Sequence, residues 1–218
     1  MKPSYLAPVR ADGRLLKSKI VDFAIVLEPS PTTAAGFKNL DPLDQASTAS
    51  YNQTTDNTAI TRPLAVNIET KEAGGDFNEA VMQLAVWTSA QYARLKRLAA
   101  TAGTLQDGIL QLPVLPVLIV QGSTWTLGAA SHDAGGTVRS PLSLFHHIIL
   151  KALALQTLWQ MFPIGSSNEI LGLYKIVAAL HRLMAWAETE YRPWFEANMV
   201  PLTPYQKAAL PNSGHVGG

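Results

Sequence analysis

Two acidic residues and a lysine stand at positions where they could form one reactive centre. Asp22 lies within the apolar run KIVDFAIVLE, and Glu69 and Lys71 close a second apolar run, PLAVNIETK. Because successive side chains of a strand point to opposite faces, Glu69 and Lys71 would project from the same face, two residues apart. The three side chains would meet if the two runs are neighbouring strands of one sheet.

This set of groups suits hydrolysis of a phosphodiester with the help of a metal ion. Mg²⁺ prefers oxygen ligands and takes only one or two carboxylates from a protein, which Asp22 and Glu69 could supply, with the carbonyl of Thr70 as a third oxygen. Such an ion polarises phosphate and lowers the pKa of bound water. Lys71 would orient the attacking water and offset negative charge that develops on phosphorus. We therefore predict a site for Mg²⁺ or Mn²⁺.

A simpler interpretation of the same residues remains open. At average amino-acid usage, the triplet Glu-x-Lys occurs by chance roughly once in a chain of this length. Glu69 and Lys71 could then be strand-end residues in solvent or in a simple ion pair. Charged groups on apolar strands are costly unless they are paired or bound to a metal, so the position of the triplet favours a functional site.

The segments around these residues predict the elements that position them. Residues 19–28 and 63–71 have the β-branched, apolar composition of buried strands. Between them, residues 29–60 are polar and rich in Ser, Thr, Pro and Asn, which predicts a mobile loop near the site or, alternatively, a disordered surface insertion. We expect the Gly74-Gly75 pair to end the second strand.

Helix and hairpin signals follow. Asp76 with Glu79 forms a capping-box pattern that predicts a helix over residues 77–100. Gly122-Ser123 lies between two apolar runs, 114–121 and 124–130, and predicts a hairpin. A second capping box, Ser166 with Glu169, predicts a long amphipathic helix that ends near Pro193. The order strand, strand, helix, hairpin, helix predicts a mixed sheet with helices on its faces in one domain, residues 1–218.

Composition narrows the class of protein. The chain has 218 residues, 47% of them hydrophobic and 15% charged, with a formal net charge of +1 and no cysteine. Disulfides and thiolate chemistry are excluded, and the charge does not suit a protein that coats nucleic acid. Residues 142–162 are long enough to span a membrane, but their histidines, lysine and glutamines argue against it. We expect an intracellular protein, nuclear or cytoplasmic, without a membrane segment.

Two basic clusters could nevertheless form local patches for nucleic acid, or be ordinary solvated surface: Arg10, Arg14, Lys17 and Lys19, and Arg94, Lys96 and Arg97. The five tryptophans lie in periodic segments and are expected in the core or at its rim, not as a platform for bases. No P-loop, dinucleotide-binding glycine motif or nucleophile elbow occurs in the sequence. Nothing in the sequence indicates an oligomeric state.

Several segments together resemble the fungal PD-(D/E)xK nuclease-like domain proteins. They are KIVDFAIVLEP, RPLAVNIETK, FNEAVMQLAVWTSAQYARL, LPVLPVLIVQGSTW and GSSNEILGLYKIVAALHRLMAWAETEYRPWF. The resemblance implies a restriction-endonuclease-like α/β/α fold with a mixed central sheet. It also implies that Asp22 opens the second core strand and that Glu69 and Lys71 lie on the third. Gln83, on the next helix, would reach the site or be an ordinary polar helix residue. The implied substrate is nucleic acid, with DNA favoured over RNA.

Two features depart from that family. Many enzymes of this fold carry a further acidic residue on a helix before the first core strand, and few residues precede the first strand here. Residues 138–156 (VRSPLSLFHHIILKALALQ) match nothing in the family and suggest an insertion. His146 and His147 within it do not share a helix face, so packing is expected of them, not metal binding. The alternative function is therefore a catalytically inactive module of this fold that binds nucleic acid or a protein partner.

Overall fold

The computed structural model describes residues 21–40, 49–54, 56–105, 111–132 and 156–200, with the side chains of residues 156–160 excepted. All five residues predicted at the site fall within these ranges. The insertion expected at 138–156, including His146 and His147, lies outside them apart from residue 156, as does the basic cluster of residues 10–19.

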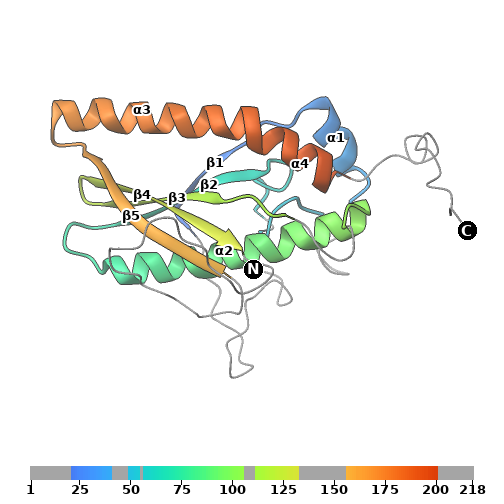
Figure 1. Ribbon diagram of the computed structural model, residues 1–218, viewed down its shortest axis with the longest axis horizontal. Coiled ribbons are helices and arrows are strands. Elements are labelled where there is room, and N and C mark those ends of the chain that lie inside the picture. Colours follow the sequence, from blue (N-terminus) through green and yellow to red (C-terminus); the bar gives the residue numbers. More distant parts are fainter. Residues whose placement is uncertain (1–20, 41–48, 55, 106–110, 133–155, 201–218) are drawn as a thin grey trace, which may run out of the picture.

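The described strands form one mixed sheet of five in the order in which they occur along the chain (Figure 1). β1 (Phe23–Val26) pairs antiparallel with β2 (Leu64–Lys71), and β2 pairs parallel with β3 (Leu115–Gln121). β3 and β4 (Thr124–His132) form an antiparallel hairpin, and β5 (Gln156–Ser166) adds antiparallel to β4. The two strands predicted around the site are thus neighbours in the sheet.

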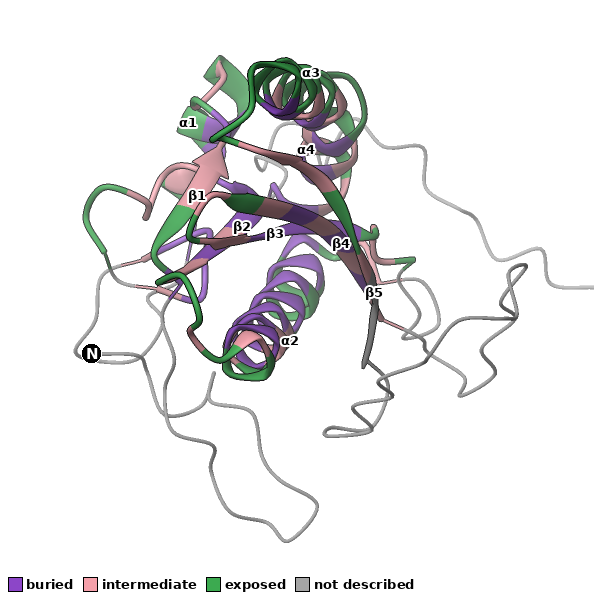
Figure 2. Ribbon diagram, turned by 90° about the vertical axis from the view of Figure 1, so that its left-hand side faces the viewer, coloured by how far each residue is buried: buried purple, intermediate pink, exposed green. Residues whose placement is uncertain are grey.

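Helices cover both faces of this sheet (Figure 2). α2 (Phe77–Ala102) crosses from β2 to β3 and packs on one face, as a parallel strand pair requires. On the other face lies a helical stretch made of α3 (Ile170–Trp186), the π-helix η2 (Ala187–Tyr191) and α4 (Arg192–Met199), with the short α1 (Pro31–Phe37) nearby. The expected α/β/α layering around a mixed sheet is confirmed.

The start and end of α2 follow from its terminal residues. The Asp76 side chain accepts hydrogen bonds from the backbone N–H groups of Asn78 (2.8 Å) and Glu79 (3.2 Å), which satisfies two donors of the first turn. Gly103 ends the helix in the left-handed region with φ 76°. The helix therefore begins where the sequence predicted and ends two residues later than expected. It places Glu79 and Gln83 at the end of β2 that carries Lys71.

The core lies on both faces of the central strands. In β3, Leu118 packs into one buried cluster and Ile119 into another, because alternate side chains of a strand point to opposite layers. Leu183 of α3 belongs to the first cluster and Leu84 of α2 to the second. β2 and β3 are thus held from both sides, so that the end of β2 is a rigid support for charged side chains.

Part of the stretch predicted as one polar loop is folded. Residues 31–37 form α1, whose N-cap Ser30 accepts from the backbone N–H of Thr33 (3.1 Å). Tyr51 is buried and its hydroxyl donates to the carbonyl of Thr33 (2.6 Å). The amide of Asn52 is also buried, and its oxygen accepts from the backbone N–H of Leu64 (3.0 Å). The expectation of a structureless connection is wrong for these residues, because polar side chains here satisfy backbone groups of the loop.

The basic cluster on α2 is also not what the sequence suggested. Arg94 is buried, and its guanidinium donates through Nε to the carbonyl of Ser50 (3.0 Å), with Nη2 on the same oxygen. It therefore ties the 49–54 segment to α2. Lys96 and Arg97 are exposed. Because Arg94 is buried, it belongs neither to a nucleic-acid patch nor to a solvated surface.

The chain after β4 differs most from the prediction. Ser166 is the last residue of β5 and not a helix cap, since α3 begins at Ile170 with Glu169 as its N-cap and without a side-chain cap bond. The helical stretch also continues beyond Pro193. Proline lacks an N–H, and Pro193 follows directly after the π-helix, where the backbone N–H of Arg192 already bonds five residues back to the carbonyl of Ala187 and interrupts the regular helical pattern.

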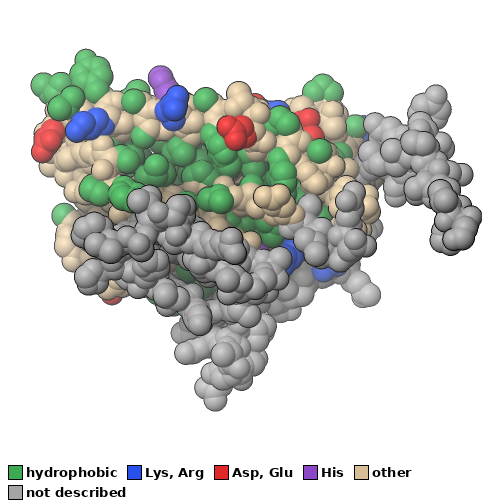
Figure 3. All heavy atoms as spheres, in the orientation of Figure 1, with side chains coloured by type: hydrophobic (Ala, Val, Ile, Leu, Met, Phe, Trp, Pro, Cys, Tyr) green, Lys and Arg blue, Asp and Glu red, His purple; other side chains and the backbone are tan. Residues whose placement is uncertain are grey.

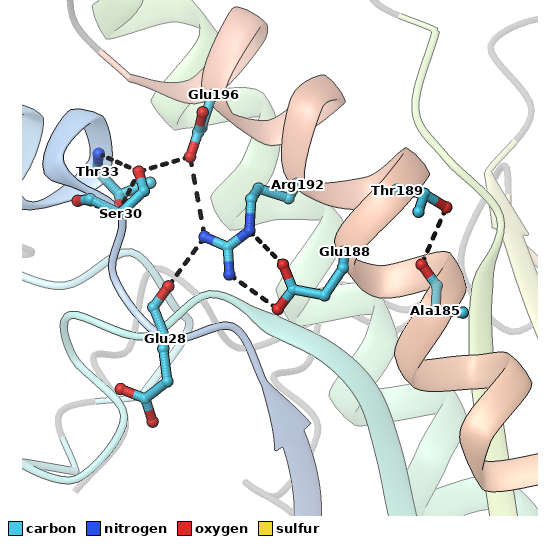
Figure 4. Close-up of polar contacts among 8 residues, drawn as sticks. All are labelled: Glu28, Ser30, Thr33, Ala185, Glu188, Thr189, Arg192 and Glu196. Atoms are coloured by element: carbon cyan, nitrogen blue, oxygen red, sulfur yellow. Dashed lines mark hydrogen bonds and ion pairs between the residues drawn. The ribbon is translucent and has the colours of Figure 1, made fainter.

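An arginine joins this π-helix to the chain after β1 (Figure 4). Arg192 binds both carboxylate oxygens of Glu188, at 2.5 and 2.9 Å, and donates to the backbone carbonyl of Glu28 at 2.9 Å. Ser30 donates to Glu196 at 2.6 Å beside it. Bidentate arginine–carboxylate pairs fix geometry as well as charge. The contacts fasten the α3–α4 stretch to the segment between β1 and α1.

The α3–α4 stretch is apolar on the outside as well. By length and composition alone, the helical stretch Ile170–Met199 is long and apolar enough to cross a membrane, as the core helix of a soluble protein can also be. Its inner side packs on the sheet through Ile176 and Leu183. Figure 3 shows apolar side chains along α3 and the adjoining sheet face. The exposed large ones there are Phe162, Ile170, Leu171, Leu173, Tyr174, Val177 and Met184.

Candidate active site

Asp22 is held against the end of β2. It lies one residue before β1, and its Oδ2 accepts hydrogen bonds from the backbone N–H of Thr70 (2.9 Å) and from the Thr70 hydroxyl (2.6 Å). The pairing of Phe23 with Ile68 sets this register. Asp22 thus lies beside Glu69, as the sequence predicted. β1 is the first described strand, whereas the resemblance placed Asp22 on the second; residues before 21 lie outside the description.

Glu69 is a buried carboxylate with one oxygen unpaired. Its side chain is 2% exposed, and its Oε1 lies 3.3 Å from Nζ of Lys71. Its Oε2 is buried without a hydrogen-bond partner. Burial raises the pKa of Glu69, the negative charge of Asp22 raises it further, and Lys71 only partly opposes both. An unpaired buried carboxylate oxygen is destabilising, and a cation beside it would remove that cost.

Lys71 is bound by three side-chain oxygens. Its ammonium lies 2.5 Å from Oε1 of Gln83, 3.3 Å from Oε1 of Glu69 and 3.5 Å from Oε2 of Glu79. Burial acts to lower the pKa of Lys71, but the carboxylates of Glu69 and Glu79 outweigh it and raise the pKa above its ordinary value. Lys71 is therefore a fixed positive charge at neutral pH. Gln83 does reach the site, through Lys71.

A buried network of amides holds β2 to α2 behind these groups. Asn67, two residues before Glu69 on the same face of β2, accepts from the indole N–H of Trp87 (2.8 Å) and donates to Oε1 of Gln91 (2.8 Å). Gln91 in turn donates to the carbonyl of Leu64 (2.8 Å). The donors and acceptors of these side chains pair with one another. The network fixes how Glu69 and Lys71 of β2 lie against Gln83 of α2.

Sequence reasoning missed two parts of this arrangement. Glu79 was noticed only as a capping residue, although its spacing of four from Gln83 puts both on one helix face and could have indicated a shared role. The two-residue period of a strand also puts Asn67 on the face of Glu69, and Trp87 was expected in the core or at its rim. Trp87 is buried as expected, but its N–H also serves the network.

The residues fit a hard divalent cation. In the described part of the chain no group of three or more His, Cys, Asp or Glu side chains could hold a metal ion, and Asp22 and Glu69 would supply two carboxylates. That number matches Mg²⁺, which keeps several waters and takes one or two carboxylates. The unpaired Oε2 of Glu69 gives such an ion a ligand that no protein group occupies. The carbonyl of Thr70 as a third ligand stays a prediction.

Removing the charge of Glu69 should stabilise the metal-free protein. A carboxyl whose pKa is raised on folding holds its proton more tightly in the folded state, so stability falls as pH rises from the ordinary value of 4.5 through the raised pKa. We expect Glu69→Gln to raise the free energy of unfolding by about 1 kcal/mol at pH 8 in chelator, measured by urea denaturation. The gain should disappear near pH 4, where the parent Glu69 is protonated. A loss of stability at pH 8 would contradict the cation-site interpretation.

Comparison with protein families places the chain. The family model described as the PD-(D/E)XK nuclease superfamily matches residues 1–192, which include every residue of the site. Comparison with curated proteins and with solved structures finds no match. The five-stranded mixed sheet with flanking helices is the restriction-endonuclease-like fold that the sequence resemblance implied. Nucleases of this superfamily generally use divalent metals and act on nucleic acid.

Proposed function

The chain belongs to the PD-(D/E)XK nuclease superfamily, and from that premise we propose that it is a metal-dependent nuclease that hydrolyses phosphodiester bonds, in DNA in preference to RNA. Asp22 and Glu69 would bind Mg²⁺ or Mn²⁺. The observation that carries this proposal is the buried Oε2 of Glu69, which has no hydrogen-bond partner. The negative charge of Asp22 acts on the same carboxylate. A structural ion pair between Glu69 and Lys71 would have no need of that oxygen.

The side chains divide the work of such a reaction. Thr70 holds Asp22 by two hydrogen bonds, so that its carboxylate stays at the end of β2. Lys71 presents a permanent positive charge, which can orient water and stabilise negative charge on phosphorus. Gln83 fixes the Lys71 ammonium from α2. A bound divalent ion would supply polarisation of the phosphate and a lower pKa for the attacking water.

A cleavage assay with and without metal tests the proposal. We expect plasmid and single-stranded DNA to be cleaved with Mg²⁺ or Mn²⁺ and to stay intact in chelator, with an RNA of the same sequence cleaved more slowly. Asp22→Asn should lower the rate by at least about 10²-fold, because the ion loses a charged ligand. Glu190→Gln is the matched control, since Glu190 is exposed on η2, on the opposite face of the sheet.

The alternative is the inactive module, and calorimetry separates it from the nuclease. A nuclease site should bind Mn²⁺ in the parent and lose that binding in Asp22→Asn. If the parent neither binds Mn²⁺ nor cleaves any of the three substrates, yet retains nucleic acid or a protein partner, the chain is a binding module of this fold. Cleavage by Asp22→Asn at the parent's rate would show that the assigned site is wrong.

A further inference from the structure

The Lys71 ammonium lies among three side-chain oxygens. An ammonium has three N–H donors, and Nζ of Lys71 lies within reach of three oxygens, on Gln83 (2.5 Å), Glu69 (3.3 Å) and Glu79 (3.5 Å). The Lys71 side chain is 17% exposed. The Lys71 ammonium is therefore held in one place before any substrate binds.

The three acceptors hold this ammonium from two elements. Glu69 acts from β2, close to the proposed ion. Glu79 and Gln83 act from α2, where a spacing of four residues places them on one helix face. The cap at Asp76 fixes the turn that carries Glu79. Without Glu79, the ammonium would keep one acceptor on the helix and one on the strand, and the charge of Glu69 would draw it toward the strand.

We propose that Glu79 is a positioning residue, which holds the Lys71 ammonium away from Glu69 and in the place where it can act. The inference rests on the proposed nuclease function, since it assigns a role within that site. Glu79 is suited to this role because its Oε2 lies 3.5 Å from Nζ of Lys71 and it acts from α2, whereas Glu69 acts from β2.

Steady-state cleavage in saturating Mg²⁺ tests this role. We expect Glu79→Ala to lower kcat about tenfold, with KM changed less than twofold, because a misplaced group affects the reaction more than it affects binding. Glu79→Gln should restore kcat to within about threefold of the parent, since its amide oxygen can accept the same hydrogen bond. Glu72→Ala is the control, because Glu72 is exposed at the same end of the sheet. Its kcat should equal that of the parent.

A second measurement reads Lys71 without any cleavage. The metal-free protein is treated with a small acylating reagent, and the modified fraction of Lys71 is followed by peptide mass spectrometry. We expect Lys71 to react several-fold faster in Glu79→Ala than in the parent, Glu79→Gln or Glu72→Ala, because one of its three acceptors is gone.

The two measurements separate the possible failures. If the parent does not cleave but Lys71 reacts faster in Glu79→Ala, the nuclease proposal fails while the contact stands without a catalytic role, and the positioning proposal is overturned with it. If the parent cleaves and Glu79→Ala matches it in kcat, Glu79 has no positioning role and the nuclease proposal is unaffected. Equal losses in Glu79→Ala and Glu79→Gln would also overturn the inference, because charge alone would then explain them.

Discussion

Replacement of Lys71 with alanine should lower the rate of DNA cleavage by about 10²–10³-fold, which is the usual effect of removing one group that stabilises charge in a transition state. Lys71 is the only cation that the described residues place beside Asp22 and Glu69, and its neighbours raise its pKa, so that it is charged throughout the neutral range. The rate is best measured in single turnover at saturating Mg²⁺, where substrate binding does not limit it. Lys71→Ala should therefore leave Mn²⁺ binding in calorimetry close to that of the parent.

Lys175→Ala is the control for this variant. Lys175 is an exposed lysine on α3, on the opposite face of the sheet, so its loss changes the net charge equally without touching the site. The control should cleave at the parent's rate. If Lys71→Ala does so as well, the assignment of the reactive centre to the end of β2 is wrong, even though the family membership stands.

The arrangement of these side chains could be predicted from sequence because its geometry is local. Glu69 and Lys71 share a strand face through the two-residue period of a strand, and the cap at Asp76 sets where α2 begins and thus where Gln83 lies. Only the position of Asp22 beside Glu69 depends on the pairing of two strands that are distant in sequence. The role of Glu79 was missed because its place in a capping-box pattern can be seen in the sequence, whereas its contact with Lys71 of β2 depends on how α2 packs on the sheet.

The elements that sequence missed depend on distant parts of the chain. β5 forms because β4 offers it a pairing partner. From the sequence up to residue 156 only an apolar insertion was predicted. α1 is a short helix of seven residues and is stabilised by Tyr51, which lies beyond it in the chain. The helical stretch passes Pro193 because that residue directly follows a π-helix, where the regular hydrogen-bond pattern is already interrupted. In each case tertiary contacts decide what local propensity leaves open.

The second large effect is on stability, and it comes from Asn67. Asn67→Ala would remove the acceptor of the Trp87 indole N–H and the donor to Oε1 of Gln91, and the loss of each buried hydrogen bond costs about 1–3 kcal/mol. We expect the free energy of unfolding to fall by about 3 kcal/mol, measured by urea denaturation in chelator. Asn168→Ala, at an exposed position between β5 and α3, should change it by less than about 0.5 kcal/mol.

A double-mutant cycle shows whether the loss belongs to the network. Gln91→Ala also breaks the contact with Asn67 and removes the side-chain donor to the carbonyl of Leu64. Because both single variants break the same chain of hydrogen bonds, the double variant should cost less than the sum of the two by about 1 kcal/mol or more. Strict additivity would mean that the two amides act separately. In that case the alignment of β2 with α2, and so of Lys71 with Gln83, would rest on apolar packing alone.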